Sequence, residues 1–520
     1  MWSFNYLYSF GKGQPNPKSV KIEFDENEAH QKTRCDVFTD WFKWLATYPM
    51  TLTQGFWNLF FLAVHREFHA PTIMNIYSGN KINCMPIPGK ATFHIVSSPS
   101  IMKEIVRFHR NDPLGPFQGK RASAILMPLL KDLFYVDAKD DDFLLTCFKA
   151  VTESYRKPIL DMIGPKNAKW IQSQLEVVIA DVMRFLEKKE VMGIIAISAA
   201  EITEMFTVAV IARALFGYSL SEKAYQKIEH ELKTLVNYQL LLEKPFGPSK
   251  AATNKYQSAL DSIRETIQNS KKGPFNDLLQ NTELSDIRQK GLILLLYIGG
   301  SEPPSSLLQY MLWRLGQNKQ YQKAILQEFK SQSSPTFWQR RPIMEAFIAE
   351  CLRMFAPGDN FSRFARKDLN IKFYGEKKEQ IYNYHIPKGE GILCSPYLAA
   401  RDPDQFPNPH QFDPSRFNPE EKEAKPFNQF NKWKPFSQNI HACPGKTLAM
   451  KEFLSLPTEI LKTYEIQSSP PKDELAFRGL PTTKEIADKD QVMLILINRK
   501  GLSNDSKVEP SLKTHGMCVC

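Results

Sequence analysis

Long amphipathic segments between about residues 99 and 355 constrain the fold of this chain more than any other feature. The stretch WIQSQLEVVIADVMRFLEKK, residues 170–189, is one of several that repeat apolar residues at the spacing of a helical face. From residue 361 to 440 the pattern changes to short strand-like runs and proline-rich loops. We expect a further helix after Cys443, followed by short strands. The pattern therefore predicts a mainly α-helical fold with small β-sheets.

The chain divides into three parts, although its 520 residues exceed the length of most single domains. Residues 1–50 are polar and irregular and are predicted to form an extension. Residues 51–500 carry the helical and strand-like patterns without an internal repeat, so we expect one large domain there. Within it, residues 72–99 contain two strand-like runs separated by a glycine-containing turn, which predicts a hairpin. Residues 501–520 form a polar tail.

The charge and the cysteines argue against several classes of protein. There are 67 basic and 56 acidic residues, a net charge of +11, but no basic run is interleaved with aromatic side chains. We therefore expect no nucleic-acid partner. The eight cysteines form no Cys-x-x-Cys pair and no dense framework. Structural zinc is not expected, and a reducing, intracellular compartment is the simpler interpretation.

The first part of the chain bears on targeting. The opening residues MWSFNYLYSFGKGQPNPKSV lack a basic start, an apolar run and a small-residue cleavage site, so no signal peptide is predicted. Residues 44–64 carry no charge and have the length of a membrane span, but polar residues, a proline and a glycine dilute them. We favour a helix on or near the surface of the fold over a membrane span. The predicted location is cytosolic or peripheral to a membrane.

Cys443 follows the segment KPFSQNIHA, which contains a proline and then a phenylalanine. A run compatible with a helix comes after the cysteine. Pro444 follows it directly, and proline suits the first position of a helix. The free N–H groups and the dipole of a helix N-terminus would stabilise a thiolate on Cys443. Such a soft sulfur is a good ligand for iron. An inert buried thiol fits the loop equally well.

A second pattern is formed by three charged residues upstream of the cysteine. Glu350 and Arg353 stand three apart on a helical segment, so they face the same side. Arg416, in the stretch FDPSRF, lies in a loop that could lock against this pair. Taken alone, such a pair is more often a solvated surface bridge.

These motifs, in this order, resemble those of the cytochrome P-450 superfamily over about residues 51–500. Glu350 and Arg353 are similar to the family's Glu-x-x-Arg pair, and Arg416 to its loop arginine. The resemblance implies that these three stabilise the fold on the proximal side of the haem. It also implies the cytochrome P-450 fold and haem b as the cofactor.

The stretch FSQNIHACPG resembles the family's haem loop, in which Phe436, Cys443 and Gly445 match the pattern. Ala449 and Glu452 fall where the following helix of the family has alanine and glutamate. By this resemblance Cys443 is the metal ligand, binding the haem iron as a thiolate. An electron-rich axial sulfur favours cleavage of the O–O bond, while the protein supplies burial and orientation.

The resemblance assigns the propionates of the haem to two further residues. His441 stands where the family usually has arginine, so that contact is expected to be weaker or pH-dependent. Arg363 resembles a strand arginine that often takes this role, although a surface charge is the alternative. Near Phe143, where the family has a Trp-x-x-x-Arg pattern, no arginine matches.

The helix expected over the distal face of the haem departs from the family. Gly299, Gly300 and Glu302 fit its Gly-Gly/Ala-x-acid-Thr pattern, but Pro303 takes the place of the threonine and Pro304 follows. Proline lacks an N–H and crowds the carbonyl four residues back, so a kinked, open turn is predicted, with two freed carbonyls that could hold water. Alternatively, the prolines end one helix and start another.

Three functions remain open for such a site. A monooxygenase could relay protons through Glu302 and water, with Ser301 or Ser305. An enzyme that uses or rearranges peroxides, such as a peroxygenase or an isomerase, needs no relay. A haem-binding protein with little turnover is the third alternative.

Substrate and partners are predicted more coarsely. In this family the pocket is lined by residues from about 110–140 and 230–250, and both regions are rich in apolar and aromatic side chains here. A lipophilic substrate is therefore expected, such as a sterol, a fatty acid or a related compound. Four lysines cluster in sequence around the cysteine loop, at positions 432, 434, 446 and 451. They would suit an acidic electron-transfer partner, a reductase or a ferredoxin, and solvated lysines are the alternative.

The chain ends in Cys518-Val519-Cys520. This ending does not form the four-residue prenylation box, but it resembles the terminal Cys-x-Cys of doubly prenylated small GTPases. Two lipid chains would give peripheral contact with a membrane. Two free thiols are the alternative.

Overall fold

The computed structural model describes the parts of the chain that build the helical core and the sheets. These are residues 19–24, 81–85, 93–105, 114–115, 156–216, 227, 230–231, 234, 249–252, 254–255, 258–259, 261–262, 286–331, 341–358, 361–365, 367–374, 380–417, 433–437, 442–469, 477–478, 485–486 and 492–502. Several predictions lie outside them, namely those for Phe143, Lys432, His441, Cys518, Cys520, residues 44–64 and most of the pocket regions.

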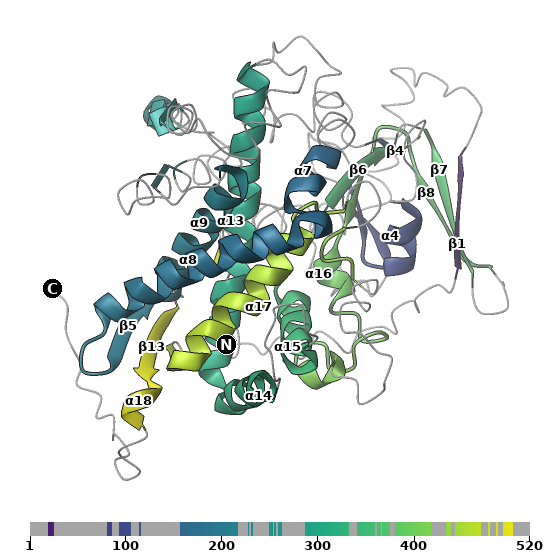
Figure 1. Ribbon diagram of the computed structural model, residues 1–520. Helices are drawn as coiled ribbons and strands as arrows, with labels where there is room; N and C mark the ends of the chain where they lie inside the picture. Colours follow the sequence, from purple (N-terminus) through teal and green to yellow (C-terminus); the bar gives the residue numbers. More distant parts are fainter. Residues whose placement is uncertain are drawn as a thin grey trace.

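Long helices form the centre of the molecule (Figure 1). In chain order they are α7 (Arg156–Ile163), α8 (Ala168–Lys189), α9 (Ala199–Phe216), α13 (Asp286–Gln317), α14 (Lys319–Lys330), α15 (Pro342–Met354) and α17 (Lys446–Thr463). Shorter turns of helix are α4 (Pro99–Ile105), η3 (Pro165–Asn167), α16 (Pro396–Ala399), η4 (Pro414–Phe417) and α18 (Arg499–Leu502). The prediction of a helix after Cys443 is confirmed by α17.

Apolar residues at helical spacing explain how these helices pack. On α8 the buried side chains include Ile171, Leu175, Val178, Val182 and Leu186, which form one stripe along the helix. That stripe belongs to the central core, and α8 contacts both α9 and α17 (Figure 1). The amphipathic pattern of residues 170–189 therefore predicted this helix correctly.

The strands form small sheets at the periphery of the helices (Figure 1). The largest has the order β2-β3-β9-β6-β4, built from β2 (Ile82–Met85), β3 (Phe93–Val96), β9 (Gly391–Cys394), β6 (Phe361–Ala365) and β4 (Leu114–Gly115). A second has the order β1-β7-β8, with β1 (Ser19–Phe24), β7 (Leu369–Tyr374) and β8 (Gln380–Ile386). A third joins β10 (Tyr464–Ser469), β13 (Met493–Asn498) and β5 (Ile194–Ser198), and β11 (Phe477–Arg478) pairs with β12 (Glu485–Ile486).

The predicted hairpin in residues 72–99 is present as the antiparallel pair β2 and β3, in which Ile82 faces Val96. The parallel pairing of β3 with β9 then joins this N-terminal hairpin to the segment that precedes α16. The prediction of a mainly helical fold with small sheets is confirmed.

Helix α13 continues through Pro303 and Pro304 without interruption. The alternative, that these prolines end one helix and start another, is therefore wrong. Each proline removes one backbone hydrogen bond and costs about 3 kcal/mol in an isolated helix. Tertiary packing overrides this local cost, since Pro304 and the four residues that follow it are buried.

Close contact with α9 explains part of that packing. A Cβ atom placed on Gly300 would lie 2.5 Å from Cδ1 of Ile211 on α9, so only glycine allows the two helices to approach this closely. One turn further on, the hydroxyls of Thr203 and Ser305 are 2.9 Å apart between the same helices. Within the part of the chain that the structure describes, no helix is long and apolar enough to cross a membrane.

Candidate functional site

Glu350 and Arg353 form a fully buried ion pair on α15. The guanidinium donates from Nε to Oε2 and from Nη2 to Oε1 of the carboxylate, both at 2.7 Å, and both side chains have an exposed fraction of 0%. Their spacing of three residues places them on one face of the helix. The alternative of a solvated surface bridge is wrong, because neither group reaches solvent.

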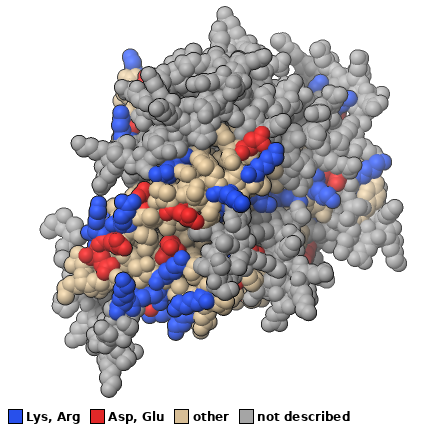
Figure 2. Space-filling model, in the orientation of Figure 1, with Lys and Arg blue, Asp and Glu red and all other residues tan. Residues whose placement is uncertain are grey.

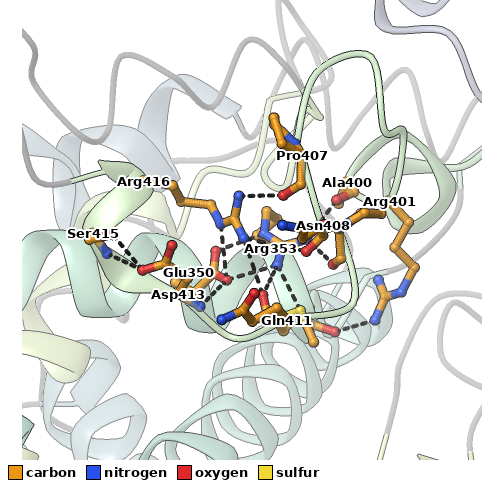
Figure 3. Close-up of polar contacts among 12 residues, drawn as sticks. Glu350, Arg353, Ala400, Arg401, Pro407, Asn408, Gln411, Asp413, Ser415 and Arg416 are labelled. Carbon is orange, nitrogen blue, oxygen red and sulfur yellow. Dashed lines mark hydrogen bonds and ion pairs between the residues drawn. The ribbon is translucent and has the colours of Figure 1, made fainter.

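The rest of the Arg353 guanidinium binds the loop that follows α16. Nη1 donates to the carbonyls of Ala400 at 2.9 Å and of Pro409 at 2.7 Å, and Nη2 donates to the carbonyl of Gln411 at 3.1 Å (Figure 3). One side chain therefore holds three carbonyls of a loop that has no regular secondary structure of its own. This is a use of the five guanidinium donors that lysine could not reproduce.

Arg416 completes the cluster from η4. Its Nε lies 3.4 Å from Oε1 of Glu350, and its Nη1 donates to the carbonyl of Pro407 at 3.0 Å (Figure 3). The backbone N–H of Asp413 donates to the same carboxylate oxygen at 2.8 Å. Arg416 thus contacts the pair as predicted, and Glu350 satisfies two arginines and one backbone amide.

An aromatic cluster connects these charges to the approach of the cysteine loop. The ring of Trp433 lies 5.6 Å from that of Phe406 and 5.4 Å from that of Phe417, measured between centroids. Phe406 belongs to the loop that Arg353 holds, and Phe417 ends η4. Trp433 is fully buried and is the third residue before Phe436. The charged cluster and the cysteine loop are therefore parts of one packed unit.

Cys443 itself sits on a turn directly before α17. Its backbone N–H donates to the carbonyl of Phe436 at 2.8 Å, and its carbonyl accepts from the N–H of Lys446 at 3.4 Å. The first residue of α17 is Lys446, with Gly445 as its N-cap, so the prediction that Pro444 opens the helix is wrong by two residues. The turn that closes between Cys443 and Lys446 delays the start of the helix, and the cysteine still lies at its N-terminal end.

The thiol of Cys443 differs from the other two thiols whose surroundings the structure describes. Cys351 and Cys394 are buried, whereas Cys443 is exposed. Burial raises the pKa of the Cys351 thiol well above its usual value, partly opposed by Arg314. A Cβ on Gly445 would lie 3.8 Å from the sulfur of Cys443, so Gly445 leaves room beside it. An accessible sulfur at the start of a helix is suited to bind a soft metal centre.

On α13, the serines proposed for proton relay are engaged elsewhere. The hydroxyl of Ser301 is buried and donates to the carbonyl of Tyr297 at 2.7 Å. The hydroxyl of Ser305 shares a hydrogen bond with Thr203 of α9 and accepts from Nε2 of Gln309 at 3.3 Å. Glu302, which is half-buried, is the acid on this turn.

Residues 56–485 match the family model described as Cytochrome P-450. This chain belongs to the cytochrome P-450 family. Membership implies haem b with an axial cysteine thiolate, and it confirms the family predicted from the motifs.

Curated relatives match this cytochrome P-450 over part of their length. A probable cytochrome P-450 of Drosophila melanogaster is 30% identical over 182 residues, which is 35% of this chain and 34% of the relative. The human mitochondrial 25-hydroxyvitamin D-1 alpha hydroxylase is 28% identical over 35% of this chain and 34% of its own length. Ferruginol synthase of Salvia fruticosa is 24% identical over 36% of this chain and 37% of its own length. The chain thus matches about a third of the length of these relatives.

Solved structures resemble this cytochrome P-450 over most of the chain. The heme domain of cytochrome P-450DA superposes with a TM-score of 0.62 at 18% sequence identity, covering 82% of this chain and 92% of that one. A mutant of the same heme domain gives a TM-score of 0.61 at 17% identity. These likenesses show the fold, which agrees with the fold class predicted from the sequence.

The residues of this cytochrome P-450 that lie around Cys443 fit the cofactor. An exposed sulfur is presented on a turn held by the Phe436 carbonyl, and the turn is followed by a helix. Arg363 lies in β6, where its backbone faces Ile392 of β9, and only its backbone is described. His441 is outside the described residues. The structure therefore brings together Phe436, Cys443 and Gly445, while the two propionate candidates stay predictions.

Two of the four lysines near the loop are buried. Lys434 has an exposed fraction of 6% and Lys451 of 5%, and Lys451 donates to the carbonyl of Ala168 at 3.2 Å. Burial lowers the pKa of each to about 8, and the nearby Lys103 adds to the effect on Lys434. Neither lysine can belong to a solvated face for an acidic partner. Lys446 is exposed, and Lys432 lies outside the described residues. On the face shown in Figure 2, the described basic side chains alternate with acidic ones.

Sequence reasoning missed the residues that join the cluster to the loop. These are the Phe406–Phe417–Trp433 cluster, the three carbonyls bound by Arg353 and the amide of Asp413. The stretch RDPDQFPNPHQFDPSRF contains Phe406 and Phe417 together with Arg416. That stretch was the available signal, but it does not show which side chains meet Trp433.

The buried carboxyl of Glu452 on α17 should make the free energy of unfolding depend on pH. Its side chain is buried, Oε1 has no partner among the described residues, and burial raises the pKa of this carboxyl from 4.5 to about 8. The folded state therefore keeps a proton that the unfolded state loses above pH 4.5, so this group costs stability as pH rises from about 4.5 to about 8. We expect Glu452→Gln to be as stable as wild type near pH 4 and more stable at pH 9, by on the order of a few kcal/mol.

Denaturant unfolding at several pH values measures this difference, with Glu459→Gln as the matched control. Glu459 lies on the same helix, is half-buried and pairs with Lys462. Its substitution should leave the difference from wild type small at every pH. The prediction would be contradicted if the free energy of unfolding of Glu452→Gln differed from that of wild type by the same amount at every pH from 4 to 9.

Proposed function

We propose that this chain is a haem-thiolate monooxygenase that inserts oxygen into a lipophilic compound, such as a sterol or a fatty acid. The observation that carries the proposal is the exposed sulfur of Cys443 on a turn that α17 follows, held by the Phe436 carbonyl. The buried cluster of Glu350, Arg353 and Arg416 supports it, because it braces the approach to that turn.

Each residue has a distinct role in this proposal. Cys443 is the thiolate ligand of the iron, with Phe436 and Gly445 beside the sulfur. Arg363 and His441 bind the propionates of the haem. When bound, a thiolate-ligated haem supplies the oxidising chemistry. The protein holds the cofactor, excludes water from the substrate and delivers protons from the side of α13, where Glu302 is the acid.

The lipophilic substrate rests on two kinds of support. The sequence regions that line the pocket in this family are apolar and aromatic here. One relative is named as a hydroxylase of 25-hydroxyvitamin D, which is itself an apolar compound. The electron donor in this proposal is a reductase or a ferredoxin that approaches the proximal side.

One observation favours a second candidate, an enzyme that uses or rearranges peroxides. Pro303 stands where the family has a threonine, and the hydroxyls of Ser301 and Ser305 are bound within α13 or to α9. Such an enzyme needs no delivery of protons and would not be impaired by their loss.

A turnover experiment separates these functions. The purified holoprotein is incubated with a panel of sterols and fatty acids, either with a reductase or ferredoxin system and ¹⁸O₂, or with hydrogen peroxide or lipid hydroperoxides alone. We expect hydroxylated product that carries ¹⁸O and depends on the electron donor. Product formed only with peroxides would replace this proposal by the second candidate. No product in either arm would favour a haem-binding protein without turnover.

The organisation around this function is part of the same proposal. A haem domain over residues 51–500 is preceded by an extension at 1–50 and followed by a tail at 501–520. We place the protein inside the cell, with the terminal cysteines as one means of peripheral membrane contact. Mass spectrometry of the C-terminal peptide from expressing eukaryotic cells would detect lipid on Cys518 or Cys520.

A further inference from the structure

The sheet formed by β10, β13 and β5 has an uncovered apolar side. Six large apolar side chains are exposed in the part of the chain that the structure describes, and five of them belong to this sheet or to the turn that leads into β5. We call these five the apolar face, and they are Val191 (70% exposed), Met192 (96%), Ile194 (48%), Met493 (40%) and Ile495 (42%). A group of exposed apolar side chains of this kind marks a site of interaction.

The two strands have the sequences of strands that are covered on both sides. β5 reads IIAIS and β13 reads MLILIN, and neither contains a charged residue. An antiparallel sheet with one side in water normally alternates apolar and polar residues. Here alternate residues of both strands are buried in the core, and on the other side Ile495 faces Ala196, which is also exposed. The outer side of the sheet is therefore built to be covered.

The apolar face ends in a tight turn. Val191 and Ile194 pair with each other around Met192 and Gly193, which have φ angles of +51° and +79°. A two-residue turn with both φ angles positive favours Asn-Gly or Asp-Gly. A methionine at its tip exposes a large apolar side chain where a small polar residue fits the backbone better. Backbone conformations of this kind, kept by an unfavourable residue, point to a function.

The backbone of the turn can leave water at low cost. The N–H of Val191 donates to the carbonyl of Ile194 at 2.9 Å, and the N–H of Ile194 donates to the carbonyl of Val191 at 3.0 Å. The carbonyl of Gly193 accepts from the N–H of Asn498 at 2.8 Å. Both carboxylate oxygens of Glu190, the acid next to the turn, lie 3.0 Å from the side-chain amide of Asn498. Polar groups that are bonded internally lower the cost of entering an apolar medium.

A lipid bilayer fits this face better than a second protein does. A stable interface between proteins uses about 20–30 residues on each side, whereas the apolar face has five and ends in a protruding turn. A bilayer needs no complementary surface, and burying one large apolar side chain shifts a partition equilibrium by about 10-fold or more. α18 contacts β13, so residues 503–520, with their terminal cysteines, are attached at this end of the molecule (Figure 1).

The charges around the apolar face have both signs. Lys188 and Lys500 are exposed beside it, but so is Glu187, and Lys189 pairs with Glu201 at 2.8 Å. Attraction to anionic lipids is therefore not the main term, and apolar insertion carries the binding.

We propose that the apolar face docks on a lipid bilayer, with the turn around Met192 inserted below the headgroups. This names the surface that makes the peripheral membrane contact proposed above. It does not depend on the reaction at the haem or on lipid attached to the terminal cysteines.

Binding to vesicles tests the proposal. The full-length holoprotein is purified from bacteria, which attach no prenyl groups, and is sedimented with vesicles of phosphatidylcholine, either alone or with phosphatidylserine. We expect wild type to bind both kinds of vesicle and Met192→Asp to bind at least about 10-fold more weakly. The haem spectrum of Met192→Asp should match wild type, because the side chain at 192 is exposed.

Val177→Asp is the matched control, since Val177 is also an exposed apolar residue but lies on α8, outside the apolar face. It should bind vesicles as wild type does. The proposal would be overturned if wild type did not bind, if Met192→Asp bound equally well, or if binding required phosphatidylserine.

Hydrogen exchange followed by mass spectrometry locates the contact. On addition of phosphatidylcholine vesicles we expect slower exchange in peptides that span residues 190–198 and 492–498, and no change in a peptide from residues 170–180 of α8. Protection confined to other parts of the chain would overturn the proposal. So would protection that appears without vesicles and grows with protein concentration, because a second copy would then cover the face. Neither experiment needs turnover, so failure of the monooxygenase proposal would leave these results intact.

Discussion

Cys443→Ala is expected to abolish the thiolate signature of the haem and to lower turnover more than about 100-fold, since losing even the partners of a metal ligand costs 10–100-fold. The physical reason is that the substitution removes the exposed sulfur on the turn before α17, which is the proposed thiolate donor to the iron. Haem content and the absorption spectrum of the reduced protein with carbon monoxide measure the effect. A variant that bound haem more weakly but kept the thiolate ligand would still show the thiolate spectrum for the haem that remains bound.

The control is Cys351→Ala, which removes a fully buried thiol on α15. It deletes one atom from the core, so a loss of about 1 kcal/mol in stability is expected without any change in the haem spectrum. A Cys443→Ala protein with an unchanged thiolate spectrum would contradict the assignment of the ligand. If the thiolate spectrum were lost in Cys351→Ala, Cys351 would be assigned as the iron ligand instead.

Arg353→Met is expected to destabilise the fold by about 3–5 kcal/mol, because it leaves the Glu350 carboxylate buried with one of its two arginine partners missing. It also removes the donor to the carbonyls of Ala400, Pro409 and Gln411, so the loop that carries Phe406 should loosen with it. Denaturant unfolding followed by circular dichroism measures the loss. Haem content of the expressed protein should fall in parallel.

Arg184→Met is the matched control for this substitution. Arg184 also pairs with an acid three residues away, Asp181, but both side chains are largely exposed. Its loss should change the free energy of unfolding by less than about 1 kcal/mol. Equal effects of the two substitutions would show that burial of the pair contributes little, against the argument made for Glu350 and Arg353.

Local features of the site were predictable because they depend on local geometry. The spacing of Glu350 and Arg353 determines that they share a helix face, and the two strand-like runs around a glycine-containing turn in residues 72–99 predicted the pair β2 and β3. The apolar period of residues 170–189 likewise predicted α8. Each of these depends on residues within a few positions of one another.

Burial and long-range pairing were not predictable in the same way. Lys434 and Lys451 read as surface charges, yet their stems and amines are enclosed by the packing around Trp433 and α17. The proline pair left a broken helix open as an alternative, yet α13 is continuous across Pro303 and Pro304 and packs on α9 at Gly300. The residues next to these lysines and prolines in the sequence do not determine which distant side chains pack against them.

By itself, the sequence determined the order of the motifs, the residue types that carry the chemistry and the helical and strand periods around them. Only the tertiary structure decided that Arg416 reaches a carboxylate 66 residues away, that Cys443 keeps its sulfur accessible while Cys351 does not, and where α17 begins. The physical reason is that periodicity is a property of neighbouring residues. Burial and distant contacts arise only when the whole chain has packed.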